Sequence, residues 1–311
     1  MGGGLPVDES VRGRPAPGLL PYIAGYSGYR QAGTAPAVHL GLPSPELTLI
    51  FTLDDPLFLA VHPDPGQPAG AYDSLAGGLH TRPALITHDG RQSGVQLRLS
   101  PLGSRALLGL PAGELAGLDV PAAELFGRLD VEIRERLRAE PTWPGRFAVL
   151  DQMLLPLLGG STEGTGSAVG QAGRRHHSGR AARAEVSPEV AHAWRLLLRS
   201  GGGLQVSTLA EHTGWSERHL RTAFRVETGL TPKAAARVIR FHRARVLLRR
   251  RVERGEPPAL ADLAVACGYY DQAHLAREFR ELAGCPPSAW VAAECRNVQA
   301  PAGDLVAASQ A

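Results

Sequence analysis

The sequence predicts an α+β protein: a β-rich N-terminal domain with a helical hairpin, followed by an all-α domain of two helix-turn-helix units. Three observations support this fold class. A short helical unit occurs twice in the C-terminal third, the excess of basic charge lies in the same third, and the first hundred residues alternate short apolar runs with turn residues. At 311 residues the chain is long enough for two domains with hydrophobic cores.

Composition divides the chain into five segments. Residues 1–18 are rich in Gly, Pro and charge, so this N-terminus and the tail at 297–311 are expected to be disordered. The Gly/Ser-rich run at 159–173 predicts a flexible linker at 159–187. The N-terminal domain is therefore expected at 19–158 and the all-α domain at 188–296.

The N-terminal domain begins with strand patterns. Residues 47–53 and 57–61 are short apolar runs, and Asp54-Asp55-Pro56 between them is a turn signal, so the two runs are expected to form a hairpin. Residues 94–99 alternate apolar and polar side chains, as a half-buried strand does.

Two helices are predicted after Pro111. Apolar residues recur every fourth position from Leu125 to Leu137, which predicts an amphipathic helix of about five turns. A second apolar helix is expected at residues 147–158 and completes the helical hairpin. The apolar stripe of the first helix is a candidate dimer interface.

No site for catalysis or metal binding is expected. The histidines at positions 39, 62, 80 and 88 lack the spacing of metal ligands. Cys267, Cys285 and Cys295 form no Cys-x-x-Cys pair. There is no nucleophile elbow, Gly-rich phosphate loop or paired catalytic carboxylate, and no cofactor is expected. The sequence shows neither a signal peptide nor a run long enough to span a membrane, so a cytoplasmic location is expected.

The internal repeat organises the C-terminal domain. Its copies are offset by 54 residues up to a Gly-aromatic pair and by 55 after it, so the second copy has one extra residue in its turn. Glycine at each turn and buried Leu and Phe positions are typical of a helix-turn-helix. The first copy contains Leu209-Ala210, Gly214-Trp215, His219-Leu220, Phe224, Gly229 and Pro232; the second contains Leu263-Ala264, Gly268-Tyr269, His274-Leu275, Phe279, Gly284 and Pro287.

The second helix of each unit is expected to read DNA. Ser216 and Asp271 are predicted N-caps of these helices. Exposed side chains near the N-terminal end of such a helix reach base edges in the major groove, where Arg can bond guanine and Gln can bond adenine. The expected base-reading residues are Arg218, Arg221, Thr222 and Arg225 in the first unit, and Gln272, His274 and Arg277 in the second.

A long basic helix is predicted between the two units. Residues 1–187 have 16 Lys/Arg and 18 Asp/Glu, whereas residues 188–296 have 17 and 11, and no acid lies between Glu227 and Glu253. A surface helix usually mixes charges, so this run predicts contact with phosphates. The helix is expected from Thr231-Pro232 to about Arg251. The expected phosphate-binding residues are Lys233, Arg237, Arg240 and Arg249.

Residues 261–287 resemble the signature of the AraC/XylS family of bacterial transcription regulators. The shared pattern includes Gly268-Tyr269, Phe279 and Gly284-Cys-Pro-Pro287, and the first repeat is similar to the upstream helix-turn-helix of the family. The resemblance implies a sequence-specific DNA-binding transcription regulator whose N-terminal domain senses a ligand or dimerises. Thr222 stands where the family often has Arg, with Arg221 beside it, and Ala273 stands where a polar residue is common.

Double-stranded DNA is the expected partner, and RNA polymerase, a small-molecule effector and a second copy of the chain are candidate partners. No membrane partner is expected. One alternative is a DNA-binding protein whose N-terminal domain is a small-molecule enzyme, although no catalytic pattern supports it. Another is a DNA-repair alkyl-transfer protein, which needs a zinc-held nucleophilic Cys in the N-terminal half, where residues 1–187 contain no Cys. We therefore expect a regulator and not an enzyme.

Overall fold

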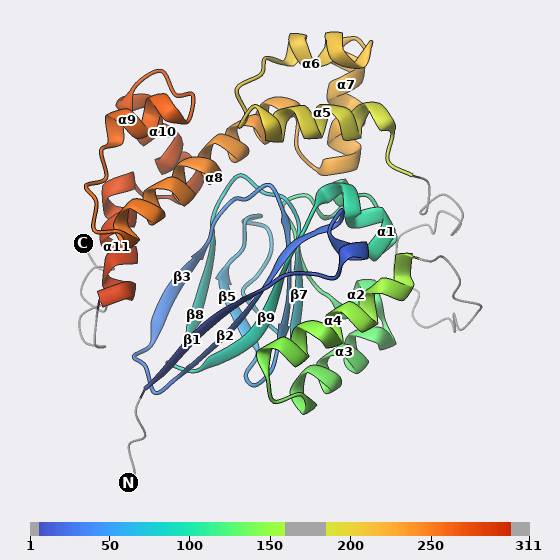
Figure 1. Ribbon diagram of the computed structural model, residues 1–311, viewed down its shortest axis with the longest axis vertical. Helices are drawn as coiled ribbons and strands as arrows, with labels where there is room; N and C mark the ends of the chain where they lie inside the picture. The colour runs from blue at the N-terminus through green and yellow to red at the C-terminus, as the bar shows by residue number, and fades with distance from the viewer. Residues whose placement is uncertain (1–5, 159–184, 300–311) are drawn as a thin grey trace.

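The computed structural model describes residues 6–158 and 185–299 (Figure 1). The expected linker at 159–187 lies outside the described residues except for its last three positions, and so does the tail from residue 300 onward. A β-rich N-terminal region is followed by an all-helical C-terminal region, so the predicted α+β fold class is confirmed.

Two antiparallel sheets form the N-terminal region. The first has the strand order β1-β2-β9-β4-β7-β10, and the second has the order β3-β8-β5-β6. Fully buried side chains on the central strands of the first sheet, such as Phe51, Val95 and Leu97, build its core. The strands are β1 (Val7–Gly13), β2 (Ile23–Ala32), β3 (Ala37–Gly41), β4 (Leu47–Thr52), β5 (Leu57–Val61), β6 (Gly70–Tyr72), β7 (Ser74–Gly77), β8 (Ala84–His88), β9 (Gln92–Leu99) and β10 (Asp119–Pro121).

The expected disorder at residues 1–18 is wrong for residues 7–13, which form strand β1. All seven pair with β2, from Val7 opposite Ala32 to Gly13 opposite Tyr26. A helix also packs closely on this pair of strands, because a Cβ added to Gly13 would lie 2.4 Å from the ring of Phe147. Pairing with a distant strand orders a segment whose own composition favours disorder.

Strands β4 and β5 do not form the predicted hairpin. Strand β4 pairs with β7 and β9 in the first sheet, whereas β5 pairs with β6 and β8 in the second. The Asp54-Asp55-Pro56 turn therefore carries the chain from one sheet to the other. A turn signal predicts a change of direction, but it does not determine which strand becomes the neighbour.

The predicted helix from Leu125 to Leu137 is broken at Gly127, which has a φ of 56°. Two helices result, α2 (Ala123–Phe126) and α3 (Arg128–Ala139), and α4 (Trp143–Leu158) follows as predicted. Ile133 and Leu137 are fully buried in the core of the N-terminal region. The apolar stripe proposed as a dimer interface therefore faces the interior. Short helices complete this region: η1 (Pro17–Leu19), η2 (Pro101–Gly103), α1 (Ser104–Leu108) and η3 (Ala112–Leu115).

Within the described residues 185–299, seven helices form the C-terminal region, and α8 crosses between two groups of them (Figure 1). One cluster of buried side chains runs from the first sheet into these helices. Among the described residues, none of the helices combines the length and apolar character needed to cross a membrane. The helices are α5 (Pro188–Arg199), α6 (Val206–Thr213), α7 (Glu217–Thr228), α8 (Pro232–Glu253), α9 (Leu260–Ala266), α10 (Gln272–Ala283) and α11 (Pro287–Gln299), which ends three residues beyond the expected domain boundary.

Candidate nucleic-acid interface

The two repeats fold as two helix-turn-helix units, α6–α7 and α9–α10. Gly214 and Gly268 occupy the left-handed region in the two turns, with φ of 69° and 75°. A side chain would strain the backbone there, which explains why glycine stands at both positions. The predicted N-caps are confirmed: Ser216 accepts a hydrogen bond from the His219 amide, and Asp271 accepts one from the His274 amide.

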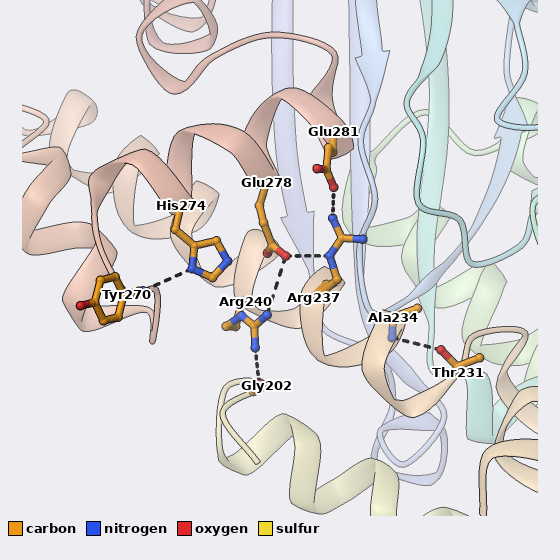
Figure 2. Close-up of polar contacts among 9 residues, drawn as sticks. All are labelled: Gly202, Thr231, Ala234, Arg237, Arg240, Tyr270, His274, Glu278 and Glu281. Carbon is orange, nitrogen blue, oxygen red and sulfur yellow. Dashed lines mark hydrogen bonds and ion pairs between the residues drawn. The ribbon is translucent and has the colours of Figure 1, made fainter. Parts of the chain in front are cut away.

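An aromatic ring and a histidine close each turn in the same way. The Trp215 and His219 rings meet edge to face with centroids 4.4 Å apart, and the equivalent Tyr269 and His274 rings do so at 5.2 Å. The extra residue of the second turn is Tyr270, which is 91% exposed. Its backbone N–H donates to Nδ1 of His274 at 3.3 Å (Figure 2).

Helix α7 presents all four predicted reading residues to solvent. Leu220 and Phe224 are fully buried on its inner face, which leaves Arg218, Arg221, Thr222 and Arg225 exposed on the outer face. The Thr222 hydroxyl donates to the carbonyl oxygen of Arg218 at 3.1 Å, so part of its hydrogen-bonding capacity is used within the helix.

The three predicted reading residues of helix α10 differ in their exposure to solvent. Gln272 and Arg277 are exposed, whereas His274 is half-buried against Tyr269. Because His274 Nδ1 accepts the Tyr270 N–H, the proton of a neutral ring lies on Nε2, which can still donate to a ligand. His274 thus stabilises the turn in addition to facing the groove described below.

Three of the four α8 residues expected to bind phosphate have partners within the protein. Lys233 is exposed, but Arg237 pairs with Glu278 and Glu281 of α10, with its Nε 2.6 Å from Glu278 Oε1. The guanidinium of Arg249 lies over the ring of Trp290 at 5.9 Å. Helix α8 has no acid before Glu253 at its end, and Glu278 and Glu281 of α10 supply carboxylates to Arg237 and Arg240.

Arg240 makes polar contacts with the turn that precedes the first helix-turn-helix unit and with the second unit (Figure 2). Its Nη1 donates to the carbonyl oxygen of Gly202, in the turn between α5 and α6, at 2.9 Å. Its Nη2 lies 3.8 Å from Glu278 Oε1, and its guanidinium lies over the Tyr269 ring at 5.7 Å. With its side chain only 18% exposed, Arg240 is part of the protein's internal packing.

Nearby carboxylates compensate the charge of Arg237. Burial alone would lower the pKa of Arg237, but its contacts with Glu278 and Glu281 raise that pKa above the ordinary value. Burial also raises the pKa of the Tyr269 phenol, so the ring next to Arg240 stays neutral. Arg237 therefore stays positively charged beside these two side chains.

A groove of about 600 Å³ lies between the two units. Its walls come from the turn before α6, from the first half of α8 and from one side of α10. The groove has basic and acidic side chains side by side and is open to solvent. Its lining consists of residues 203–206 together with Lys233, Ala236, Arg237, Arg240, His274, Arg277, Glu278 and Glu281.

The N-terminal region contacts the last turn of the reading helix α7. Arg105 forms a two-point ion pair with Glu227, with both distances at 2.8 Å. A Cβ on Gly113 would lie 2.1 Å from the carbonyl oxygen of Val226, which shows how closely η3 approaches α7. The outer, N-terminal end of α7 remains exposed.

Sequence reasoning missed two residues at this interface, Glu278 and Tyr270. The repeat contained a signal for each. Glu278 is acidic where the first copy has Ala223, and Tyr270 is the residue by which the second turn is longer.

Residues 209–293 match a family model described as a helix-turn-helix domain. An uncharacterized HTH-type transcriptional regulator of Bacillus subtilis, YbfI, is 37% identical over 70 residues. That alignment covers 22% of this chain and 23% of YbfI, so the chain matches about a quarter of this relative.

Two solved structures resemble the chain to different extents. The DNA-binding domain of AdpA, crystallised with a target DNA, is 26% identical and has a TM-score of 0.32, covering 36% of this chain and 97% of that one. ToxT from Vibrio cholerae is 10% identical with a TM-score of 0.47, covering 86% of this chain and 96% of that one.

The tandem units and the family match define a DNA-binding domain of the helix-turn-helix class. The resemblance to the AraC/XylS family is confirmed for residues 209–293, which form a helix-turn-helix domain of the AraC type.

Proposed function

We propose that the protein is a transcription regulator that binds a specific DNA duplex through both helix-turn-helix units. The observation that carries this proposal is the pair of equivalent units joined by one straight helix. Helix α8 has 22 residues, which at 1.5 Å per residue is about 33 Å. One turn of B-DNA has about the same length, so the two reading helices fit successive major grooves on one face.

The exposed side chains of α7 and α10 read bases in this arrangement. Arg221 and Arg277 bond guanine through two contacts each, and Gln272 bonds adenine. Because the two helices carry different exposed residues, they read different sequences, and one polypeptide recognises an asymmetric site. His274 contributes through its Nε2 proton, from the wall of the groove.

Lys233 keeps its proposed contact with a DNA phosphate, because its ammonium group is exposed at the groove. Arg237, Arg240 and Arg249 are proposed instead to stabilise the packing around α8. Fewer free cations imply that binding depends less steeply on salt than the basic run by itself suggests.

Selection of duplexes from a random pool by the purified protein tests the function. We expect enrichment of one asymmetric site about two major grooves long, with an affinity well above that for random duplex. Arg221→Ala and Arg277→Ala should each relax the preference at one position, in different halves of the site. Equal affinity for the selected site and for random duplex would contradict the proposal.

The N-terminal region is proposed as the regulatory domain, through a bound effector, a second copy of the chain or both. A pocket of about 480 Å³, open to solvent, lies at the turn between β4 and β5. Polar side chains such as Tyr29, Thr52 and Arg91 line this pocket, which suits a small polar ligand. Sedimentation of the full chain with and without the selected duplex measures whether one copy or two bind, and a reporter controlled by the site reports activation or repression through RNA polymerase.

A further inference from the structure

We propose that Arg240 is a positioning residue that sets which spacing between the two halves of the DNA site the protein accepts. This inference rests on the proposed function. The sequence suggests a phosphate contact for this guanidinium, but the structure gives it three partners within the protein.

The first contact joins Arg240 to the turn between α5 and α6, which leads into the first helix-turn-helix unit. Its Nη1 donates to the carbonyl oxygen of Gly202 at 2.9 Å. Gly202 has a φ of 78°, and a Cβ there would lie 2.2 Å from the carbonyl oxygen of Ala236. The turn before α6 therefore packs directly on the backbone of α8, and Arg240 stabilises it in that position.

The other contacts join Arg240 to the second unit. The carboxylate of Glu278 on α10 lies 3.8 Å from Nη2, and the ring of Tyr269, in the turn before α10, lies beneath the guanidinium. The Glu278 side chain is only 8% exposed, and Arg237 donates to the same oxygen at 2.6 Å. Two guanidiniums and one nearly buried carboxylate thus hold α10 against α8 (Figure 2).

The Arg240 side chain therefore contacts both the turn before α6 and the second unit. Glu278 holds α10 at the same position on α8. A buried charge that loses its partner is costly, so the three groups favour a single arrangement. Ala223 occupies the position equivalent to Glu278 in the first unit, and a methyl group can neither accept the Arg237 hydrogen bond nor pair with Arg240. This arrangement of two guanidiniums and one carboxylate is therefore specific to the contact between α8 and the second unit.

A rigid junction makes the affinity of the protein depend on the spacing between the two halves of the DNA site. Inserting one base pair between two half-sites moves the second by about 3.4 Å and rotates it by roughly a tenth of a turn, since B-DNA repeats every 10–10.5 base pairs over about 34–36 Å. A protein whose two reading helices are held at a fixed distance and orientation loses contacts with one half of the altered DNA site. A protein whose second unit can tilt recovers part of them.

Equilibrium binding of the full chain to three duplexes tests the inference: the selected site, and the same site with one base pair inserted or removed between its halves. We expect the affinity of the wild-type protein to be lower by tenfold or more for either altered duplex than for the selected site. Arg240→Met keeps the apolar stem and removes the polar contacts. Its affinity should fall less than threefold between the selected site and either altered duplex, and its binding to the selected site should be weaker than that of the wild type. Glu278→Gln should change the spacing ratio in the same direction, and Arg240→Lys should fall between Arg240→Met and the wild type.

Lys233→Met is the matched control, because Lys233 lies in the same groove and is exposed. It should weaken binding to all three duplexes by one factor and leave their ratios unchanged. If Arg240→Met behaves like Lys233→Met, with wild-type spacing ratios and a shallower salt dependence, Arg240 binds phosphate and the inference is wrong. It is also wrong if the wild-type protein prefers the selected sequence but tolerates every spacing. A wild-type protein that prefers no sequence would contradict the proposed function itself.

Discussion

Arg105 of α1 and Glu227 of α7 form an ion pair that joins the N-terminal region to a helix proposed to read DNA. Both contacts measure 2.8 Å, and the two side chains are 16% and 13% exposed. An acid in the last turn of a helix is disfavoured by the helix dipole. The contact with Arg105 offsets this cost and raises the pKa of the guanidinium. The orientation of α7 therefore depends on the N-terminal region.

Reversing either charge of this pair should destabilise the full chain by about 2–4 kcal/mol, because it leaves like charges facing each other in a largely buried contact. The variants are Arg105→Glu and Glu227→Arg, measured by urea unfolding. The double variant should recover at least half of the summed loss. Losses that simply add in the double variant would show that the two residues act independently.

Gly113→Ala should separate η3 from α7. The new methyl group would lie 2.1 Å from the Val226 carbonyl oxygen, and backbone on both sides leaves little room to adjust. We expect a loss of about 1–3 kcal/mol in unfolding free energy, as for other overpacked sites, and faster hydrogen exchange in the last turn of α7. Gly66→Ala is the control, because its Cβ would meet only the side chain of Asp64 at 3.3 Å. Similar exchange rates in both variants would contradict a close contact at Gly113.

Replacing the reading arginines should change specificity at separate positions. Arg221→Ala and Arg277→Ala are each expected to reduce the discrimination at one base pair by about 1–3 kcal/mol. Affinity for random duplex should change much less. The measurement is competition binding with every single-base variant of the selected site. If both substitutions affected the same half of the site, the assignment of one helix to each half would be wrong.

Acid should destabilise the protein through His242 on α8. Burial, together with the nearby charges of Arg245 and Arg98, lowers its pKa to about 4. The folded pKa lies below the unfolded value of about 6.5, so the unfolded chain takes up a proton first as the pH falls. Stability is therefore retained above pH 6.5 and declines between 6.5 and 4, by about 2 kcal/mol at pH 5.

Urea unfolding at pH 7.5 and pH 5.0 measures this effect, with His242→Gln for comparison. The variant lacks the titrating ring. Between the two pH values its free energy of unfolding should therefore fall by about 2 kcal/mol less than that of the wild-type protein. An equal change in both proteins would place the acid sensitivity in other groups.

Local features of the C-terminal region were predictable in detail. The N-caps at Ser216 and Asp271 and the glycine turns at positions 214 and 268 follow from short-range backbone requirements, and each is confirmed. The exposed face of α7 follows from the spacing of Leu220 and Phe224. In the N-terminal region, individual strands such as β4 and β5 were predictable, but their neighbours were not. Strand pairing depends on residues far apart in the chain, and a turn residue reports only on its own backbone.

Two helix-turn-helix units joined by one helix can be predicted from the sequence, because glycine turns, caps and helical spacing are local and occur twice. The contacts made by the basic residues of α8 depend instead on tertiary packing. Arg237 meets a carboxylate 41 positions away, and Arg240 meets a carbonyl oxygen 38 positions away. Two arginines of an acid-free run therefore form a junction with the carboxylates of α10, since charges pair through space and not along the chain.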